Sequence, residues 1–219
     1  MNNFNIVVAS EKHISYAEEI CAVIEDSAQK RGTGIAKRSP LYIAQKMKEG
    51  KAVIALSKEG KFAGFCYIES WGTDQKYVAN SGLIVVEEFR HAGLAMKIKK
   101  KAFDLSREKY PNCKLFGLTT SLAVLKINNE LGYRPVTFSE LTDDEAFWKG
   151  CQSCVNYDIL TRTNRKHCLC TGMLYDSSEQ SKTKKKFQDI KSKYEKWLKI
   201  KRDLLFSRFR KKEETKEIF

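Results

Sequence analysis

The chain has 219 residues, a hydrophobic fraction of 42% and a formal net charge of +13. This length allows one domain with its own core and an additional segment. No apolar run approaches the ~20 residues that cross a bilayer, and the start of the chain lacks the basic and apolar regions of a signal peptide. The sequence therefore argues against a membrane-spanning or secreted protein, and we expect a cytoplasmic location.

The periodicity of apolar residues predicts alternating strands and helices up to residue 175. Strands are expected at residues 5–9, 52–57, 62–70, 77–86, 114–120, 136–138, 157–161 and 169–175. Helices are expected at residues 13–31, 41–48, 94–103 and 122–131. This order predicts an α/β (α+β) fold with a central mixed, mostly antiparallel sheet flanked by helices. We expect this domain to span residues 1–176.

One loop, between the strand at 77–86 and the helix at 94–103, carries the clearest chemical signal. It reads Arg90-His91-Ala92-Gly93-Leu94-Ala95. A strand, a loop of small residues and a helix start form a cradle for pyrophosphate, because free N–H groups and the positive helix end point at the anion. Gly93 allows close approach of the backbone, and Arg90 adds a charged hydrogen bond. The alternative is an ordinary strand-to-helix turn.

The spacing Arg-x-x-Gly-x-Ala in this loop resembles the acyl-CoA signature of the Gcn5-related N-acetyltransferase (GNAT) superfamily, and the order of elements is similar over residues 5–140. The resemblance implies the GNAT fold, an N-acyltransferase activity and acetyl-CoA as co-substrate. It also implies that the backbone of Leu83, Ile84 and Val85 pairs with the pantetheine arm of CoA and polarises the thioester carbonyl. Ser121 takes the place of a common Asn that contacts CoA. Asn128 stands where many members have a Tyr as general acid.

Two further segments resemble the acetyltransferase domain of bacterial N-acetylglutamate synthase. They are Lys37-Arg38-Ser39 and the strand Lys114 to Thr120. This likeness implies that Lys37, Arg38 and Ser39 hold the carboxylates of an acidic amino acid such as glutamate, in arginine biosynthesis. An Arg of the family motif is missing after Thr120, and Arg134 is the candidate to replace it.

The reaction also needs a base for the acceptor amine. The synthase has a Glu on the strand before the phosphate loop, but Ala79, Asn80 and Ser81 offer no carboxylate there. Glu69, on the preceding strand, is the best substitute; the alternative is a surface carboxylate. The donor acyl group, acetyl or succinyl, and an acceptor amine of another kind stay open.

Four of the seven Cys residues form a Cys-x₂-Cys pair and a Cys-x-Cys pair. They are Cys151, Cys154, Cys168 and Cys170. Thiolates from two tight turns can hold a tetrahedral zinc ion. The alternative is a set of buried or redox-active thiols.

The C-terminal part has a different composition. Residues 177–183 read as a polar linker, and residues 184–219 as a basic amphipathic helical tail. Residues 177–219 contain 15 Lys and Arg against 7 Asp and Glu, so they hold a net charge of +8, most of the chain's net +13. We expect the tail to pack on the domain or to form a homodimer. A nucleic acid or an anionic membrane is the other partner it suits, which leaves a zinc-stabilised nucleic-acid-binding protein as the alternative function.

Overall fold

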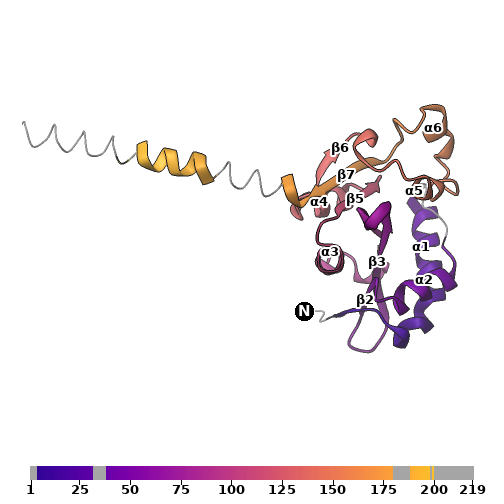
Figure 1. Ribbon diagram of the computed structural model, residues 1–219. Helices are drawn as coiled ribbons and strands as arrows, with labels where there is room; N and C mark the ends of the chain where they lie inside the picture. Colours follow the sequence, from indigo (N-terminus) through magenta and orange to yellow (C-terminus); the bar gives the residue numbers. More distant parts are fainter. Residues whose placement is uncertain (1–3, 32–37, 180–187, 198, 200–219) are drawn as a thin grey trace, which may run out of the picture. The chain divides into compact units, whose positions relative to one another are not determined.

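The computed structural model describes residues 4–31, 38–179, 188–197 and 199. The chain divides into two compact units, residues 1–176 and 177–219. The first unit is built on a seven-stranded sheet of order β1-β2-β3-β4-β5-β7-β6 (Figure 1). The strands are β1 (Asn5–Val8), β2 (Ala52–Leu56), β3 (Phe62–Trp71), β4 (Tyr77–Val85), β5 (Lys114–Thr119), β6 (Arg134–Val136) and β7 (Thr171–Asp176). In this sheet β4 and β5 are parallel and the other neighbours are antiparallel, so the predicted mixed sheet is confirmed.

Helices cover both faces of the sheet. They are α1 (Ala17–Arg31), α2 (Pro40–Lys48), α3 (Leu94–Lys109), α4 (Leu122–Glu130), α5 (Glu145–Lys149) and α6 (Tyr157–Arg162), with 3₁₀ turns η1 (Glu11–Tyr16), η2 (Thr73–Gln75), η3 (Glu87–Phe89) and η4 (Phe138–Glu140). Apolar residues of α1 and α2 pack against one face of β2 and β3 and form one core. Apolar residues of α3 pack against the alternate residues of the same strands, on the other face, and form a second core. None of the described helices combines the length and apolar character needed to cross a membrane.

The helix starts follow from local sequence. Ser39 caps α2, since its hydroxyl accepts the N–H of Tyr42 at 3.2 Å and Pro40 occupies the first turn. Asp144 caps α5 in the same way through the N–H of Ala146, at 2.8 Å. Because Ser39 is held as the cap of α2, the backbone of the preceding residue, Arg38, is held at the start of this helix.

The parallel strands β4 and β5 diverge after a short pairing. Their register joins Tyr77, Val78 and Ala79 to Lys114, Leu115 and Phe116, and it ends there. On its other edge β4 carries a bulge, because the pairing with β3 shifts between Phe65 and Tyr67 and Gly82 has a φ of +63°. From Asn80 onward, β4 therefore has an edge toward β5 with no strand paired to it in the described sheet.

The structure corrects three sequence-based expectations in the C-terminal third of the sheet. Residues 157–161, expected as a strand, form helix α6. Within this helix, the hydroxyl of Thr161 donates to the main-chain carbonyls of Tyr157 and Asp158. Helix α5 was not expected, and β6 ends at Val136, where the predicted strand 136–138 begins.

The second unit contains the expected C-terminal helix over the described residues 188–197. Its apolar side chains Ile190, Tyr194 and Trp197 are 54%, 58% and 50% exposed. Their spacing places them on one face of the helix, and the rings of Tyr194 and Trp197 stack with centroids 5.9 Å apart. The rest of the predicted tail lies outside the described residues.

Candidate functional site

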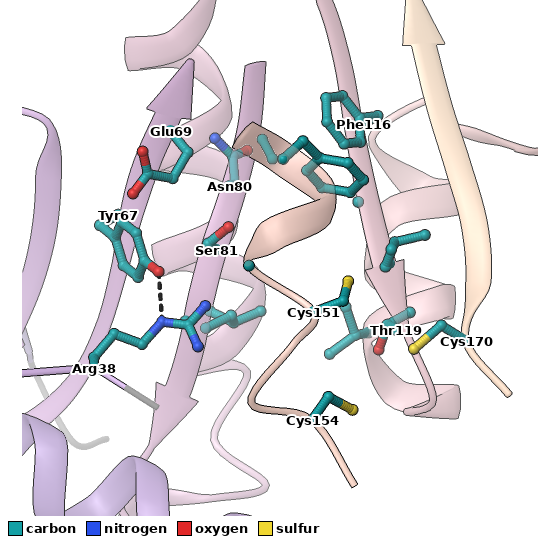
Figure 2. A pocket seen from close by; sticks show the side chains of 18 of the residues that line it. Arg38, Tyr67, Glu69, Asn80, Ser81, Phe116, Thr119, Cys151, Cys154 and Cys170 are labelled. Atoms are coloured by element: carbon teal, nitrogen blue, oxygen red, sulfur yellow. Dashed lines mark hydrogen bonds between the residues drawn. The ribbon is translucent and has the colours of Figure 1, made fainter. Parts of the chain in front are cut away.

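A cavity of about 720 Å³ opens where β4 and β5 diverge. Its walls come from α2, β3, β4, α3, β5, α4, α5 and the segment after α5. Arg38, Tyr67 and Glu69 stand on one side of this cavity, and Cys151, Cys154 and Cys170 stand on the opposite side (Figure 2). The cavity therefore combines cationic, acidic and thiol groups near a free strand edge.

Arg38 lines the cavity as a partly buried cation. Its Nε donates to the hydroxyl of Tyr67 at 2.7 Å (Figure 2), and its guanidinium carbon lies 5.7 Å from the centroid of the same ring. Its Nη1 is buried without a hydrogen-bond partner among the described residues. A buried guanidinium with an unused donor is suited to an anionic group in the cavity.

Glu69 lies on the same side, on β3. Its Oε2 accepts a hydrogen bond from Nζ of Lys46 at 2.9 Å, and both side chains are 13% exposed. Its Oε1 is buried and has no partner within the described structure. Burial raises the pKa of the carboxyl to about 7, against the opposing charge of Arg38. Burial likewise lowers the pKa of Lys46. A carboxyl with a pKa near 7 can exchange protons at neutral pH.

The predicted phosphate loop enters α3 through two residues in the left-handed region. Gly93 precedes α3 with a φ of +70°, and His91 has a φ of +64°. A Cβ built on Gly93 would have no heavy atom within 4 Å, so the space above the glycine is open. Arg90 is turned back, because its Nε donates to the carbonyl of Val85 at 3.2 Å and its Nη2 to the hydroxyl of Ser27 at 3.4 Å. Arg90 thus braces the loop, whose exposed residues include Ala92, while Leu94 is buried and Ala95 half-buried.

The three backbone candidates on β4 differ in position. Leu83 lines the cavity. Ile84 and Val85 are buried and pair with Phe65 and Gly64 of β3. All three lie beyond the point at which β4 and β5 part, but the carbonyl of Ile84 lies beside Gly64 of β3 and that of Val85 accepts Nε of Arg90. Leu83 is therefore the candidate whose main chain is best placed for an extended ligand along that edge.

Helix α4 brings Ser121 and Asn128 to the cavity. The hydroxyl of Ser121 caps the helix by accepting the N–H of Val124 at 3.5 Å. Asn128 is 1% exposed, and its Oδ1 has no hydrogen-bond partner among the described residues. A buried amide oxygen of this kind is an acceptor that a ligand can use.

Comparisons with known proteins bear on this arrangement. No family model and no curated protein matches the chain. N-acetylglutamate synthase from Neisseria gonorrhoeae, solved with coenzyme A and N-acetyl-glutamate, has a TM-score of 0.57 and 17% identity, over 80% of this chain and 35% of the synthase chain. Rv2747 from Mycobacterium tuberculosis, in complex with CoA, has a TM-score of 0.56 and 14% identity, over 78% and 98%. A mosquito arylalkylamine N-acetyltransferase like 5b has a TM-score of 0.52 and 13% identity, over 80% and 100%.

The chain has the fold of the GNAT acetyltransferases. It spans about a third of the length of the synthase, at 35%. At these identities the likeness concerns the fold, and the roles of individual residues depend on the geometry above.

Of the predicted substrate residues, one lies outside the described residues and another is absent from the described lining of the cavity. Lys37 lies outside the described residues. Arg134, on β6, is exposed and forms an ion pair with Glu140 at 2.9 Å, and it is not among the residues that line the cavity. The expectation that Arg134 replaces the missing Arg is therefore not supported by its position. Ser39 lines the cavity, although its hydroxyl is used as the cap of α2.

The four cysteines gather beside the cavity as free thiols. They line a small apolar cavity of about 30 Å³ next to Leu118 and Leu160. Burial raises the pKa of Cys151 to about 11 and that of Cys170 to about 12, and the neighbouring thiols add to both shifts. Within the described residues, no group of three or more His, Cys, Asp or Glu is arranged to hold a metal ion. The zinc prediction thus has no support from the geometry, and the four residues are partly buried free thiols.

Several lining residues were not anticipated. The rings of Trp71, Phe116 and Phe147 form an aromatic wall, with Phe147 edge-on to the other two at 5.2 and 4.9 Å. Phe147 and the cavity-lining Lys149 come from α5, which the sequence pattern did not reveal. One face of β3 carries every second residue, including Tyr67, Glu69 and Trp71, and these three line the cavity. The two-residue period of a strand could have predicted this grouping from the sequence.

Proposed function

We propose that this protein is an acyl-CoA-dependent N-acyltransferase that transfers an acetyl group to the amine of a small acidic amino acid such as glutamate. The observation that carries the acceptor is Arg38, whose buried Nη1 has no hydrogen-bond partner among the described residues and whose Nε is fixed by Tyr67. Lys149 lines the same cavity and offers a second cation for a second carboxylate.

The donor side of the proposal rests on the loop and the strand edge. Open space above Gly93 and its left-handed φ suit the pyrophosphate of CoA at the start of α3. The edge of β4 from Asn80 to Val85 suits the amides of pantetheine, and Leu83 lies where its N–H group can polarise a thioester carbonyl. The synthase of similar fold is solved with CoA and N-acetyl-glutamate.

Glu69 is the proposed base for the acceptor. An amino acid arrives as an ammonium ion and must lose a proton before it attacks. The carboxylate of Glu69 can accept that proton directly or through a water, because its Oε1 lacks a partner in the described cavity and its pKa is about 7. Asn128, which lines the same cavity, supplies a further hydrogen-bonding group.

A second acceptor class is favoured by the aromatic wall. Trp71, Phe116 and Phe147 offer an apolar surface inside the cavity. An α-amino acid with one carboxylate for Arg38 and a large apolar side chain for this wall would use both features. The two classes differ in what the side chain of the acceptor needs.

The test is thiol release from acetyl-CoA with a panel of acceptors. Glutamate and aspartate should release CoA faster than phenylalanine, tryptophan and methionine, and succinyl-CoA is tried beside acetyl-CoA. Arg38→Ala should slow release with the acidic acceptors, and Arg134→Ala is its control, because it removes an exposed Arg outside the cavity. Release with the apolar amino acids alone would select the second class. No release above background with any amino acid would refute the proposed acceptor.

We also propose that residues 1–176 form the catalytic domain and that the C-terminal helix joins two chains as a homodimer. The support is the exposed face formed by Ile190, Tyr194 and Trp197, which has the spacing of a helix-pairing surface. Sedimentation of the full chain against a chain ending at residue 176 tests this, and a monomer in both cases would refute it.

A further inference from the structure

Lys99 is a buried lysine that the reaction outlined above does not use. It lies on α3, is 2% exposed, and lines the cavity. Its Nζ donates to the main-chain carbonyl of Asn80 at 3.3 Å and lies 5.5 Å from the centroid of the Tyr133 ring. Nothing in the described part of the chain pairs it with a carboxylate. An ammonium group is costly to bury without one, so its presence calls for a reason.

The contacts of Lys99 place it at the divergence of the two parallel strands. Asn80 is the first residue of β4 beyond the pairing with β5. Ile68 lies opposite Asn80 on β3, and its N–H points away from β4, because it donates to the main-chain carbonyl of Lys51 at 2.7 Å. Ile68 and Asn80 therefore do not bond to each other, and the carbonyl of Asn80 faces the β5 side. Lys99 thus takes a carbonyl that a paired β5 would have used. The next residues of β4, up to Leu83, line the cavity with it.

The same cluster reaches the residue of α4 that stands where many GNAT enzymes have their acid. Tyr133, under the Lys99 ammonium, donates its main-chain N–H to the carbonyl of Asn128 at 3.0 Å. The hydroxyl of Tyr133 donates to Oδ1 of Asn80 at 3.4 Å. Lys99 therefore contacts the carbonyl of Asn80 at the free edge of β4 and the ring of Tyr133, and it lines the same cavity as Asn128.

We propose that the ammonium group of Lys99 is the proton donor to the CoA sulfur in this reaction. The inference rests on the proposed function. The neutral acceptor amine forms the C–N bond, and the nitrogen of the adduct loses its second proton to solvent. The C–S bond breaks, and its electron pair goes to sulfur. Lys99 gives one proton to sulfur, which yields the CoA thiol and a neutral Lys99. The proton that Glu69 removed from the acceptor returns to Lys99 through solvent, so no oxidant or reductant is needed.

The titratable neighbours of Lys99 fit this role. Burial lowers the pKa of Lys99, which makes its proton easier to give. Burial raises the pKa of the Cys66 thiol to about 11 and holds the pKa of Tyr133 well above its ordinary value. Both neighbours therefore stay neutral at physiological pH. Lys99 is the member of this cluster whose pKa is shifted toward physiological pH.

The test is the ionisation of CoA bound as product, which needs no acceptor. The ultraviolet absorbance of the thiolate is followed against pH as the difference between complexes with CoA and with desulfo-CoA. In the wild type, the bound thiol should ionise about one to three pH units lower than in Lys99→Met, as expected for an adjacent cation. Lys101→Met, an exposed lysine of the same helix, is the control and should match the wild type. Equal thiol titrations in wild type and Lys99→Met would overturn the proposal.

Lys99→Arg separates the two roles of the charge. A guanidinium keeps the charge but cannot give up its proton. This variant should keep the lowered ionisation of bound CoA and lose about a hundredfold in turnover, at the low end for a general acid. Full turnover in Lys99→Arg would show that charge alone suffices and refute proton donation. Calorimetry separates this failure from that of the proposed function, since a wild type that binds no CoA refutes both, whereas binding with equal titrations refutes Lys99 alone.

Discussion

Substitution of Gly93 by Val tests the anion cradle most directly. The residue has a φ of +70°, so any side chain there adopts the left-handed region, at a cost of about 1–2 kcal/mol. For a chain of this size that cost corresponds to a fall in Tm of about 2–8 °C. The Cβ of the new side chain would meet no protein atom within 4 Å, so the side chain starts in the open space where we place the pyrophosphate. Calorimetry with CoA should show at least a tenfold loss of affinity, about 1.4 kcal/mol.

Gly60→Val is the matched control. Gly60 lies in the turn between β2 and β3 with a φ of +81°, and a Cβ on it also meets nothing within 4 Å. The backbone strain of the two variants is therefore comparable, but only Gly93 belongs to the proposed cradle. The control should lose similar stability and keep the CoA affinity of the wild type. Equal CoA affinity in the wild type and Gly93→Val would show that the loop is not the cradle.

Three further predictions concern the acceptor side, the base and the tail. Arg38→Ala should raise the KM for an acidic acceptor about tenfold to over a hundredfold, since one charged hydrogen bond is worth about 1.5–3 kcal/mol, and the KM for acetyl-CoA should change little; equal acceptor KM values would remove Arg38 from the site. The rate of the wild type should rise with pH through about 7 as Glu69 loses its proton, and Glu69→Gln should lose that limb of the profile; an unchanged profile would exclude Glu69 as the base. Trp197→Ala should shift the full chain from dimer to monomer in sedimentation, and an unchanged dimer would refute the pairing face.

The sequence predicted the elements whose apolar periods are long and whose ends are marked. Helix α3 shows a clear period, and Ser39 with Pro40 marks the start of α2. The prediction of a strand at 157–161 was wrong, because a short segment with Tyr, Ile and Thr has no apolar period that separates a strand from a helix. Its helical state depends on the burial of Leu160 and on hydroxyl-to-carbonyl bonds that the sequence does not display.

The candidate site was predictable where one loop carries it and was missed where tertiary contacts create it. The loop at Gly93 is local, so its conformation follows from its residues. Lys99 sits in a run of lysines that resembles a solvated face. Its helical neighbours Ala95, Ala102 and Ser106 place it on a face that is largely buried. The sequence shows this only when the helical period of small and apolar residues is traced across the charged run around Lys99.

The divergence of β4 and β5 explains why these features occur together. Ending a parallel pairing after three residue pairs leaves main-chain groups of two central strands without their usual partners. Such groups must be satisfied by side chains, water or a ligand. Lys99 satisfies the carbonyl of Asn80, and the pantetheine amides of CoA are suited to the groups that follow. A ligand that fills this gap completes the sheet, so CoA should protect the amides of β4 against hydrogen exchange more than those of β2, and equal protection of both strands would argue against this account.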